Sequence, residues 1–164
     1  MRILVTVASR HGATAEMGDV VARELEQAGH TVDVIAPDDV ERVVPYDAVV
    51  LGSAVYVGRL AASLRDLVER QGAHLRLRPV FLFWSGPVGD PPMPAGVPDD
   101  VTDMARTVEA DDVMCFVGAL DRSQLNLSER ALVALTKAEA GDFRDWDVVR
   151  DWGRKVAKSL AGTP

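Results

Sequence analysis

The sequence predicts an α/β fold: a doubly wound, five-stranded parallel sheet with helices on both faces. Short apolar runs alternate along the chain with helical patterns, which is typical of parallel β/α units. The first run, residues 3–8, has almost no polar interruption, as expected of a strand buried on both faces. The composition, 48% hydrophobic and 26% charged over 164 residues, is ordinary for one folded domain, here expected to span residues 1–164. Right-handed crossovers favour the strand order 2-1-3-4-5.

Five apolar segments account for the strands. The second alternates around Asp33, which indicates an edge position, and the third is expected to end at Gly52. The expected strands are residues 3–8, 31–35, 48–51, 80–84 and 113–117.

Helical spacing fills the segments between the strands. The first helix is expected to end at Gly29 and the next, which begins near Leu60, at Gly72. Asp145 is a suitable N-cap for the last helix. The expected helices are residues 13–28, a turn or two within 38–44, 60–72, 101–108 and 146–160.

Residues 120–144 form an insertion that a five-stranded α/β fold of this kind does not need. It follows the fifth strand, contains a weakly amphipathic piece at residues 128–137, and lies on the side where such sheets hold ligands. We expect this insertion to decide which partner a bound ligand meets. The alternative is an ordinary surface excursion that packs on the last helix.

Charge and cysteine content exclude several classes. A net charge of −7 disfavours nucleic-acid binding, and the apolar runs are too short to cross a membrane. Because no signal-peptide pattern is visible at the N-terminus, we expect a cytoplasmic protein. Cys115 cannot form an internal disulfide and is expected to be a small buried residue of the fifth strand. The histidines have no metal-ligand spacing, and no catalytic triad or Cys/His pair is apparent.

The loop after the first strand predicts an anion site. Hydroxyls, a glycine and free backbone N–H groups at a helix N-terminus suit a phosphate, although a plain β/α turn is the alternative. The dinucleotide motif G-x-G-x-x-G, the nucleotide-triphosphate loop, the receiver-domain aspartates and the tyrosine-phosphatase cysteine are all missing. The loop residues are Ser9, Arg10, His11, Gly12, Ala13 and Thr14.

Two further loops face the same edge and indicate a flat heterocycle with a phosphorylated tail, for which FMN fits. Tyr56 or Trp84 offers a ring for stacking, though a Trp that ends a central strand is as often a core residue. The first loop holds Ser53, Ala54, Val55, Tyr56, Val57 and Gly58, and the second holds Trp84, Ser85, Gly86, Pro87 and Gly89.

These motifs resemble those of the flavodoxin family. The strand followed by S-x-x-G-x-T at residues 9–14 is similar to the family's phosphate loop, and residues 49–54 with Tyr56-x-Gly58 are similar to its second flavin loop. Residues 8–14, 52–59 and 116–121, the insertion, and Asp145-Trp146 are most similar to the menaquinone-dependent protoporphyrinogen dehydrogenase branch. His11 departs from the family pattern, because it stands where a hydroxyl residue is usual.

The resemblance implies a flavodoxin-like fold, an FMN cofactor and a role in heme biosynthesis. It implies electron transfer from a reduced tetrapyrrole or similar donor to a quinone-type acceptor, and it leaves peripheral membrane contact open. The flavin would supply the redox chemistry, so no catalytic side chain is expected. Two alternatives remain: an electron carrier whose partner is a redox protein, and a fold relative that has lost the cofactor and acts as an interaction module.

Overall fold

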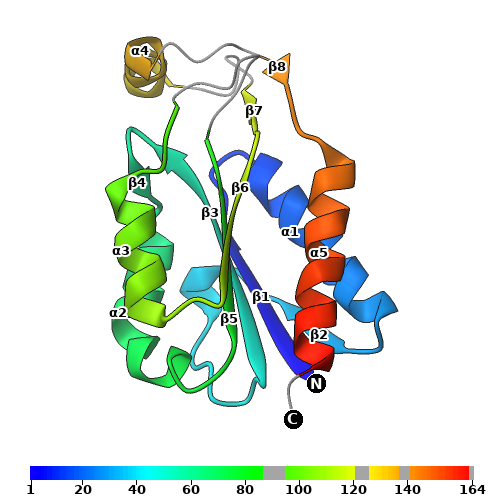
Figure 1. Cartoon of the computed structure of the whole chain (residues 1–164). Coiled ribbons are helices and arrows are strands. Elements are labelled where there is room, and N and C mark those ends of the chain that lie inside the picture. Colours follow the sequence, from blue (N-terminus) through cyan, green and yellow to red (C-terminus); the bar gives the residue numbers. More distant parts are fainter. Residues whose placement is uncertain (87–94, 121–125, 137–140, 163–164) are drawn as a thin grey trace.

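The computed structural model describes residues 1–86, 95–120, 126–136 and 141–162. Its main sheet confirms the expected topology, with parallel strands in the order β2-β1-β3-β5-β6 (Figure 1). These strands are β1 (Arg2–Ala8), β2 (Thr31–Val34), β3 (Ala48–Tyr56), β5 (Val80–Ser85) and β6 (Asp112–Phe116).

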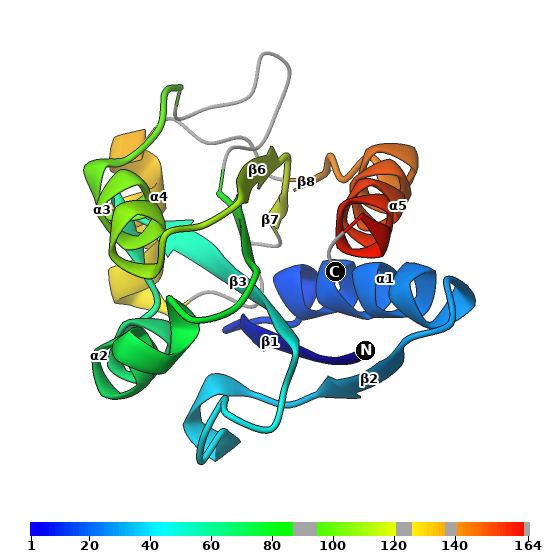
Figure 2. The ribbon, with the colours of Figure 1, turned by 60° about the horizontal axis from the view of Figure 1, so that its bottom comes forward.

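Helices cover both faces of the sheet, as Figures 1 and 2 show. On one face lie α1 (Ala13–Gln27) and α5 (Trp146–Ala161), and on the other α2 (Ala62–Leu75) and α3 (Asp99–Val108). The expected turn before the third strand is a short 3-10 helix, η1 (Pro37–Asp39). Asp145 caps α5 as expected, because its side chain accepts hydrogen bonds from the backbone N–H groups of Asp147 and Val148.

Side chains alternate along the central strands into separate apolar layers, one under each pair of helices. The layer under α5 contains an aromatic cluster of Phe83, Phe116 and Trp152, with ring centroids 5.3 to 5.8 Å apart. Thr6 is also fully buried in β1, and its hydroxyl has no hydrogen-bond partner among the described residues.

Two glycines do not end the elements that they were expected to end. β3 continues through Gly52 to Tyr56, because Gly52 pairs with Val7 of β1 and Phe83 of β5. An added Cβ at Gly52 would lie 2.4 Å from Cζ of the Phe83 ring. Likewise, α2 continues through Gly72 to Leu75. Both glycines adopt ordinary element geometry, so neither breaks the backbone pattern.

The segment expected as a second flavin loop is therefore mostly strand. Val57 and Gly58 form the turn of a tight hairpin, with positive φ angles of 50° and 74°. The chain then returns as β4 (Arg59–Leu60), which pairs antiparallel with the end of β3.

The insertion has elements of its own. Its ends pair antiparallel as β7 (Ala119–Leu120) and β8 (Gly141–Asp142), and between them lies α4 (Leu127–Thr136). Figure 1 shows α4 beyond the carboxyl end of β3. Cys115 is exposed rather than buried; it lies in β6, an edge strand of the main sheet.

Candidate functional site

The loop between β1 and α1 has the backbone of an anion site. Gly12 occupies the N-cap position of α1 with φ of 88°, a conformation that favours glycine. Its N–H donates to the Ser9 hydroxyl over 3.0 Å, and its carbonyl accepts the Glu16 N–H over 3.0 Å. The N–H groups of Ala13 and Thr14 have no acceptor within the helix, as at every helix N-terminus. The loop thus presents backbone donors at the carboxyl end of β1.

The charged side chains of this loop contact the insertion. His11 Nε2 lies 2.8 Å from a carboxylate oxygen of Glu129 in α4, and the Arg10 guanidinium lies 3.7 Å from the other oxygen. The Glu129 side chain is only 9% exposed. The hydrogen bond with His11 is the main cause that lowers the pKa of the Glu129 carboxyl group. The loop therefore already pairs with one negative group.

Glu129 was missed from the sequence, although a local signal was available. The Asn126 side chain accepts the N–H of Glu129 over 2.8 Å, and the Glu129 carboxylate lies 3.5 Å from the N–H of Asn126. This reciprocal pattern is a capping box, which N-x-x-E before an apolar run could have indicated. The pairing with His11 joins residues 118 positions apart and had no local signal.

Two buried hydroxyls join the first and third loops. Thr14 and Ser85 are each 3% exposed, and their hydroxyl oxygens lie 2.8 Å apart. The backbone of Gly86 passes so close to the second loop that an added Cβ would lie 2.9 Å from the carbonyl oxygen of Val55. The three expected loops therefore meet at one edge of the sheet, while Pro87 and Gly89 lie outside the described residues.

Two residues expected at the ligand, Ser53 and Trp84, have structural contacts. The Ser53 hydroxyl accepts the N–H of Ala61 over 3.0 Å and donates to the carbonyl of Ala54 over 2.7 Å, which fixes the approach to α2. Trp84 is 3% exposed and packs in the core, which agrees with the alternative that it is a core residue.

Tyr56 and Val57 remain at the open edge. Tyr56 is half-buried at the end of β3. Burial raises the pKa of its hydroxyl, the charge of Glu129 raises it further, and that of Arg10 opposes this rise. The Tyr56 hydroxyl thus shares its electrostatic surroundings with the ion pair of the first loop. Val57, at the hairpin turn, is 52% exposed.

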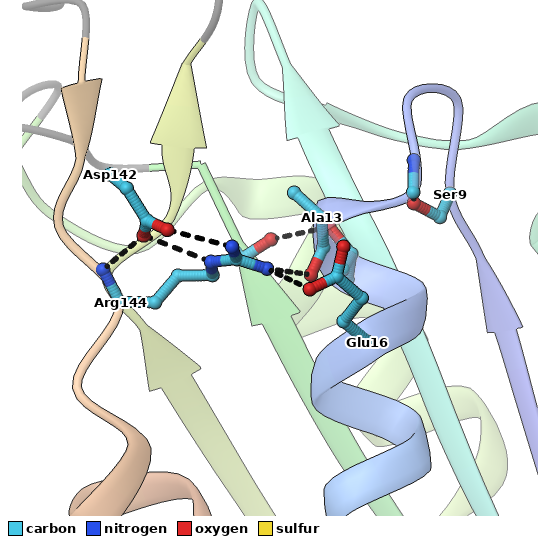
Figure 3. Close-up of polar contacts among 8 residues, drawn as sticks. Ser9, Ala13, Glu16, Asp142 and Arg144 are labelled. Atoms are coloured by element: carbon cyan, nitrogen blue, oxygen red, sulfur yellow. Dashed lines mark hydrogen bonds and ion pairs between the residues drawn. The ribbon is translucent and has the colours of Figure 1, made fainter.

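A second ionic cluster, which the sequence did not indicate, flanks the start of α1. Figure 3 shows Arg144, just after β8, reaching the first turn of that helix. Its guanidinium donates to the Ala13 carbonyl over 3.2 Å, to Glu16 over 3.0 Å and to Asp142 over 2.7 and 2.9 Å. The Arg144 side chain is 11% exposed, and its guanidinium lies 4.7 Å from the centroid of the Trp146 ring. This cluster attaches the end of the insertion to the helix that begins at the anion loop.

The residues present fit a phosphate group. The loop combines the free N–H groups of a helix N-terminus with the side chains of Arg10 and His11, which already hold a carboxylate in the structure. Tyr56 adds an aromatic ring at the same edge. Fold and site together define a protein that binds a phosphorylated aromatic cofactor beyond the carboxyl ends of a parallel sheet.

The comparisons with known proteins narrow this class. A profile described as the flavodoxin domain matches residues 4–147, and the chain belongs to this family. It is an FMN-binding electron-transfer protein of flavodoxin-like fold. No curated protein sequence matches the chain.

Solved structures agree on the fold. The chain is similar to a flavodoxin from the domain Archaea, with a TM-score of 0.69 and 14% identity over 98% of this chain and 99% of that one. The flavodoxin of Megasphaera elsdenii gives a TM-score of 0.63 and 16% identity, over 95% of this chain and 98% of that one. The flavodiiron core from Synechocystis gives 0.70 and 13%, over all of this chain and 37% of that one. Within the described residues, no helix has the length and apolar character to cross a membrane.

Proposed function

We propose that this protein is an FMN-dependent oxidoreductase that passes electrons from a reduced donor to a quinone-type acceptor. The observation that carries the proposal is the position of α4, which Glu129 holds against the phosphate loop beside Tyr56. An electron carrier needs an open flavin edge and gains nothing evident from such an added wall. A protein that selects a small substrate gains from an added wall, because walls around a cofactor decide which molecules reach it.

The proposed cofactor contacts follow from the site. The loop residues would hold the phosphate through backbone N–H groups and the side chains of Arg10 and His11. The hairpin turn and Gly86 would border the ring, and Tyr56 would stack on it. FMN itself supplies electron acceptance and donation, and the protein supplies orientation and charge. The proposed contact residues are Ser9, Arg10, His11, Gly12, Ala13, Thr14, Ala54, Val55, Tyr56, Val57, Gly58, Ser85 and Gly86.

The resemblance to the protoporphyrinogen dehydrogenase branch suggests a tetrapyrrole donor and a menaquinone-type acceptor. This assignment would place the protein in heme biosynthesis, with transient contact at a membrane surface where the quinone resides. The flavodoxin-domain profile, which matches residues 4–147, extends across the insertion.

An electron carrier is the second candidate. The observation in its favour is that the chain covers 99% of the archaeal flavodoxin and 98% of the flavodoxin from Megasphaera. The net charge of −7 would favour docking to a basic redox partner.

Removing the insertion separates these candidates. Because Leu120 pairs with Gly141, residues 121–140 can be replaced by Asn-Gly, the preferred turn of a two-residue hairpin. This replacement keeps Asp142, which binds Arg144. We expect the shortened protein to retain FMN, shown by its visible spectrum, and to reduce small artificial acceptors at the normal rate.

Turnover with quinone and with reduced tetrapyrrole decides the outcome. The proposal requires the full-length protein to use them and the shortened protein to lose this activity. Equal turnover by both proteins would refute a role for the insertion. Failure of the full-length protein with both substrates would favour the electron carrier.

A further inference from the structure

We propose that Glu129 is a specificity-determining residue of the cofactor site: its carboxylate competes with the FMN phosphate for His11 and Arg10. Docking of α4 and binding of the phosphorylated cofactor then oppose each other. The inference rests on the proposed placement of the phosphate at residues 9–14.

Burial and several contacts fix the position of the Glu129 side chain against the loop. Its side chain is 9% exposed, one oxygen lies 2.8 Å from His11 Nε2 and the other lies 3.7 Å from Arg10. The capping box with Asn126 holds Glu129 in the first turn of α4 and restricts the position of its side chain. The charge of this carboxylate also raises the pKa of the Tyr56 hydroxyl, at the end of β3.

The carboxylate uses the groups that a phosphate at this loop needs. Both positively charged or protonatable side chains of the loop are directed to Glu129. A phosphate monoester carries between one and two negative charges at neutral pH and would meet this carboxylate at close range, where like charges repel strongly. FMN binding must therefore displace Glu129 from His11 or take place against its charge.

Thermodynamic linkage makes the effect reciprocal. If docked Glu129 weakens phosphate binding, bound phosphate weakens docking of α4 by the same factor. Glu129 would then discriminate by ligand charge, with a large effect on FMN and little on riboflavin, which has the same ring without the phosphate. It would also link the state of the cofactor site to the position of the insertion.

The test compares flavin affinities of the wild type and Glu129→Gln, which keeps the size of the side chain and removes its charge. Binding is measured by quenching of flavin fluorescence, with FMN and with riboflavin. The control is Glu16→Gln, which removes a charge from the first turn of α1 that is 61% exposed and paired with Arg144. We expect Glu129→Gln to bind FMN about tenfold more tightly, with riboflavin affinity within about twofold, and Glu16→Gln to change FMN affinity by less than about threefold.

Hydrogen exchange on the wild type gives a second readout that needs no variant. We expect FMN to raise amide exchange of residues 127–136, and riboflavin to leave it unchanged. Equal or weaker FMN binding by Glu129→Gln, an equal gain by the control variant, or slower exchange of α4 with FMN would overturn the inference. A wild type that binds no FMN would refute the cofactor assignment itself, and the inference with it.

Discussion

Replacing Gly52 by alanine tests the packing that joins β3 to the aromatic cluster under α5. The new Cβ would lie 2.4, 2.5 and 2.9 Å from three carbon atoms of the Phe83 ring. That ring is fully buried and is held between Phe116 and Trp152, at centroid distances of 5.3 and 5.8 Å. The ring must move by about 1 Å to restore ordinary contact, and its neighbours oppose the movement.

The expected loss of stability follows from two opposing effects. Overpacking a well-filled core costs about 1–3 kcal/mol, and the tight flanking of Phe83 points to the upper end. Alanine restricts the unfolded chain more than glycine does, which returns about 0.4–1 kcal/mol. We therefore expect Gly52→Ala to lower the free energy of unfolding by about 2 kcal/mol.

Urea unfolding followed by circular dichroism, at a fixed FMN concentration, measures this change. The matched control is Gly72→Ala in α2, where an added Cβ meets no heavy atom within 4 Å. There we expect a gain of about 0.8 kcal/mol from helix propensity alone. Adding Phe83→Leu to Gly52→Ala should recover at least about 1 kcal/mol relative to the sum of the single effects. A stable Gly52→Ala protein, or additive effects in the double variant, would refute the packing argument.

Four further predictions follow from features described above. Thr6→Val removes a buried hydroxyl that has no partner in the described part of the chain, so unfolding in urea should show a gain of about 1 kcal/mol, and a loss would reveal a hidden hydrogen bond. Val57→Asn places a residue that tolerates positive φ at the hairpin turn, and the thermal midpoint should rise with a gain of about 1 kcal/mol. The Arg144 guanidinium lowers the pKa of the Asp142 carboxyl group. The stability from this pair should therefore be present above the unfolded pKa near 3.9 and should disappear as the pH falls through the lower folded pKa. The Asp142→Asn variant should lack this part of the profile of stability against pH. Thr14→Val should weaken FMN binding by about 1 kcal/mol in a fluorescence titration, and unchanged affinity would show that the hydroxyl serves only its bond to Ser85.

Much of the sheet was predictable because its causes are local or general. Unbroken apolar runs mark the central strands, and the handedness of crossovers then favours the observed order. The cap at Asp145 was predictable for the same reason, since the backbone N–H groups that donate to its side chain lie within three residues.

The glycines show where local reasoning fails. The sequence around Gly52 and Gly72 offers the same residue type, yet one makes room for a ring from another strand and the other has free space beside it. Only the tertiary neighbours distinguish these situations, so the ends of β3 and α2 could not be predicted from the residues alone.

The candidate site divides in the same way. The anion loop was visible because its backbone pattern is contiguous, whereas the partners of its side chains are distant in sequence. His11 and Glu129 are 118 positions apart, and Arg144 is 131 positions from Ala13. His11 was expected to bind the phosphate alone, and in the structure it pairs with the Glu129 carboxylate.

The short β7–β8 pair also bears on how this protein can diverge. The pair brings the ends of the insertion together, and Arg144 attaches them to α1. The insertion is therefore a closed loop attached to the main sheet, whatever its length. Closure entropy grows slowly, by about 0.6 kcal/mol for each doubling of a flexible loop. Evolution could thus lengthen, exchange or recode this one segment at little cost to folding, and an insertion grafted from a relative between Leu120 and Gly141 would leave the scaffold unchanged.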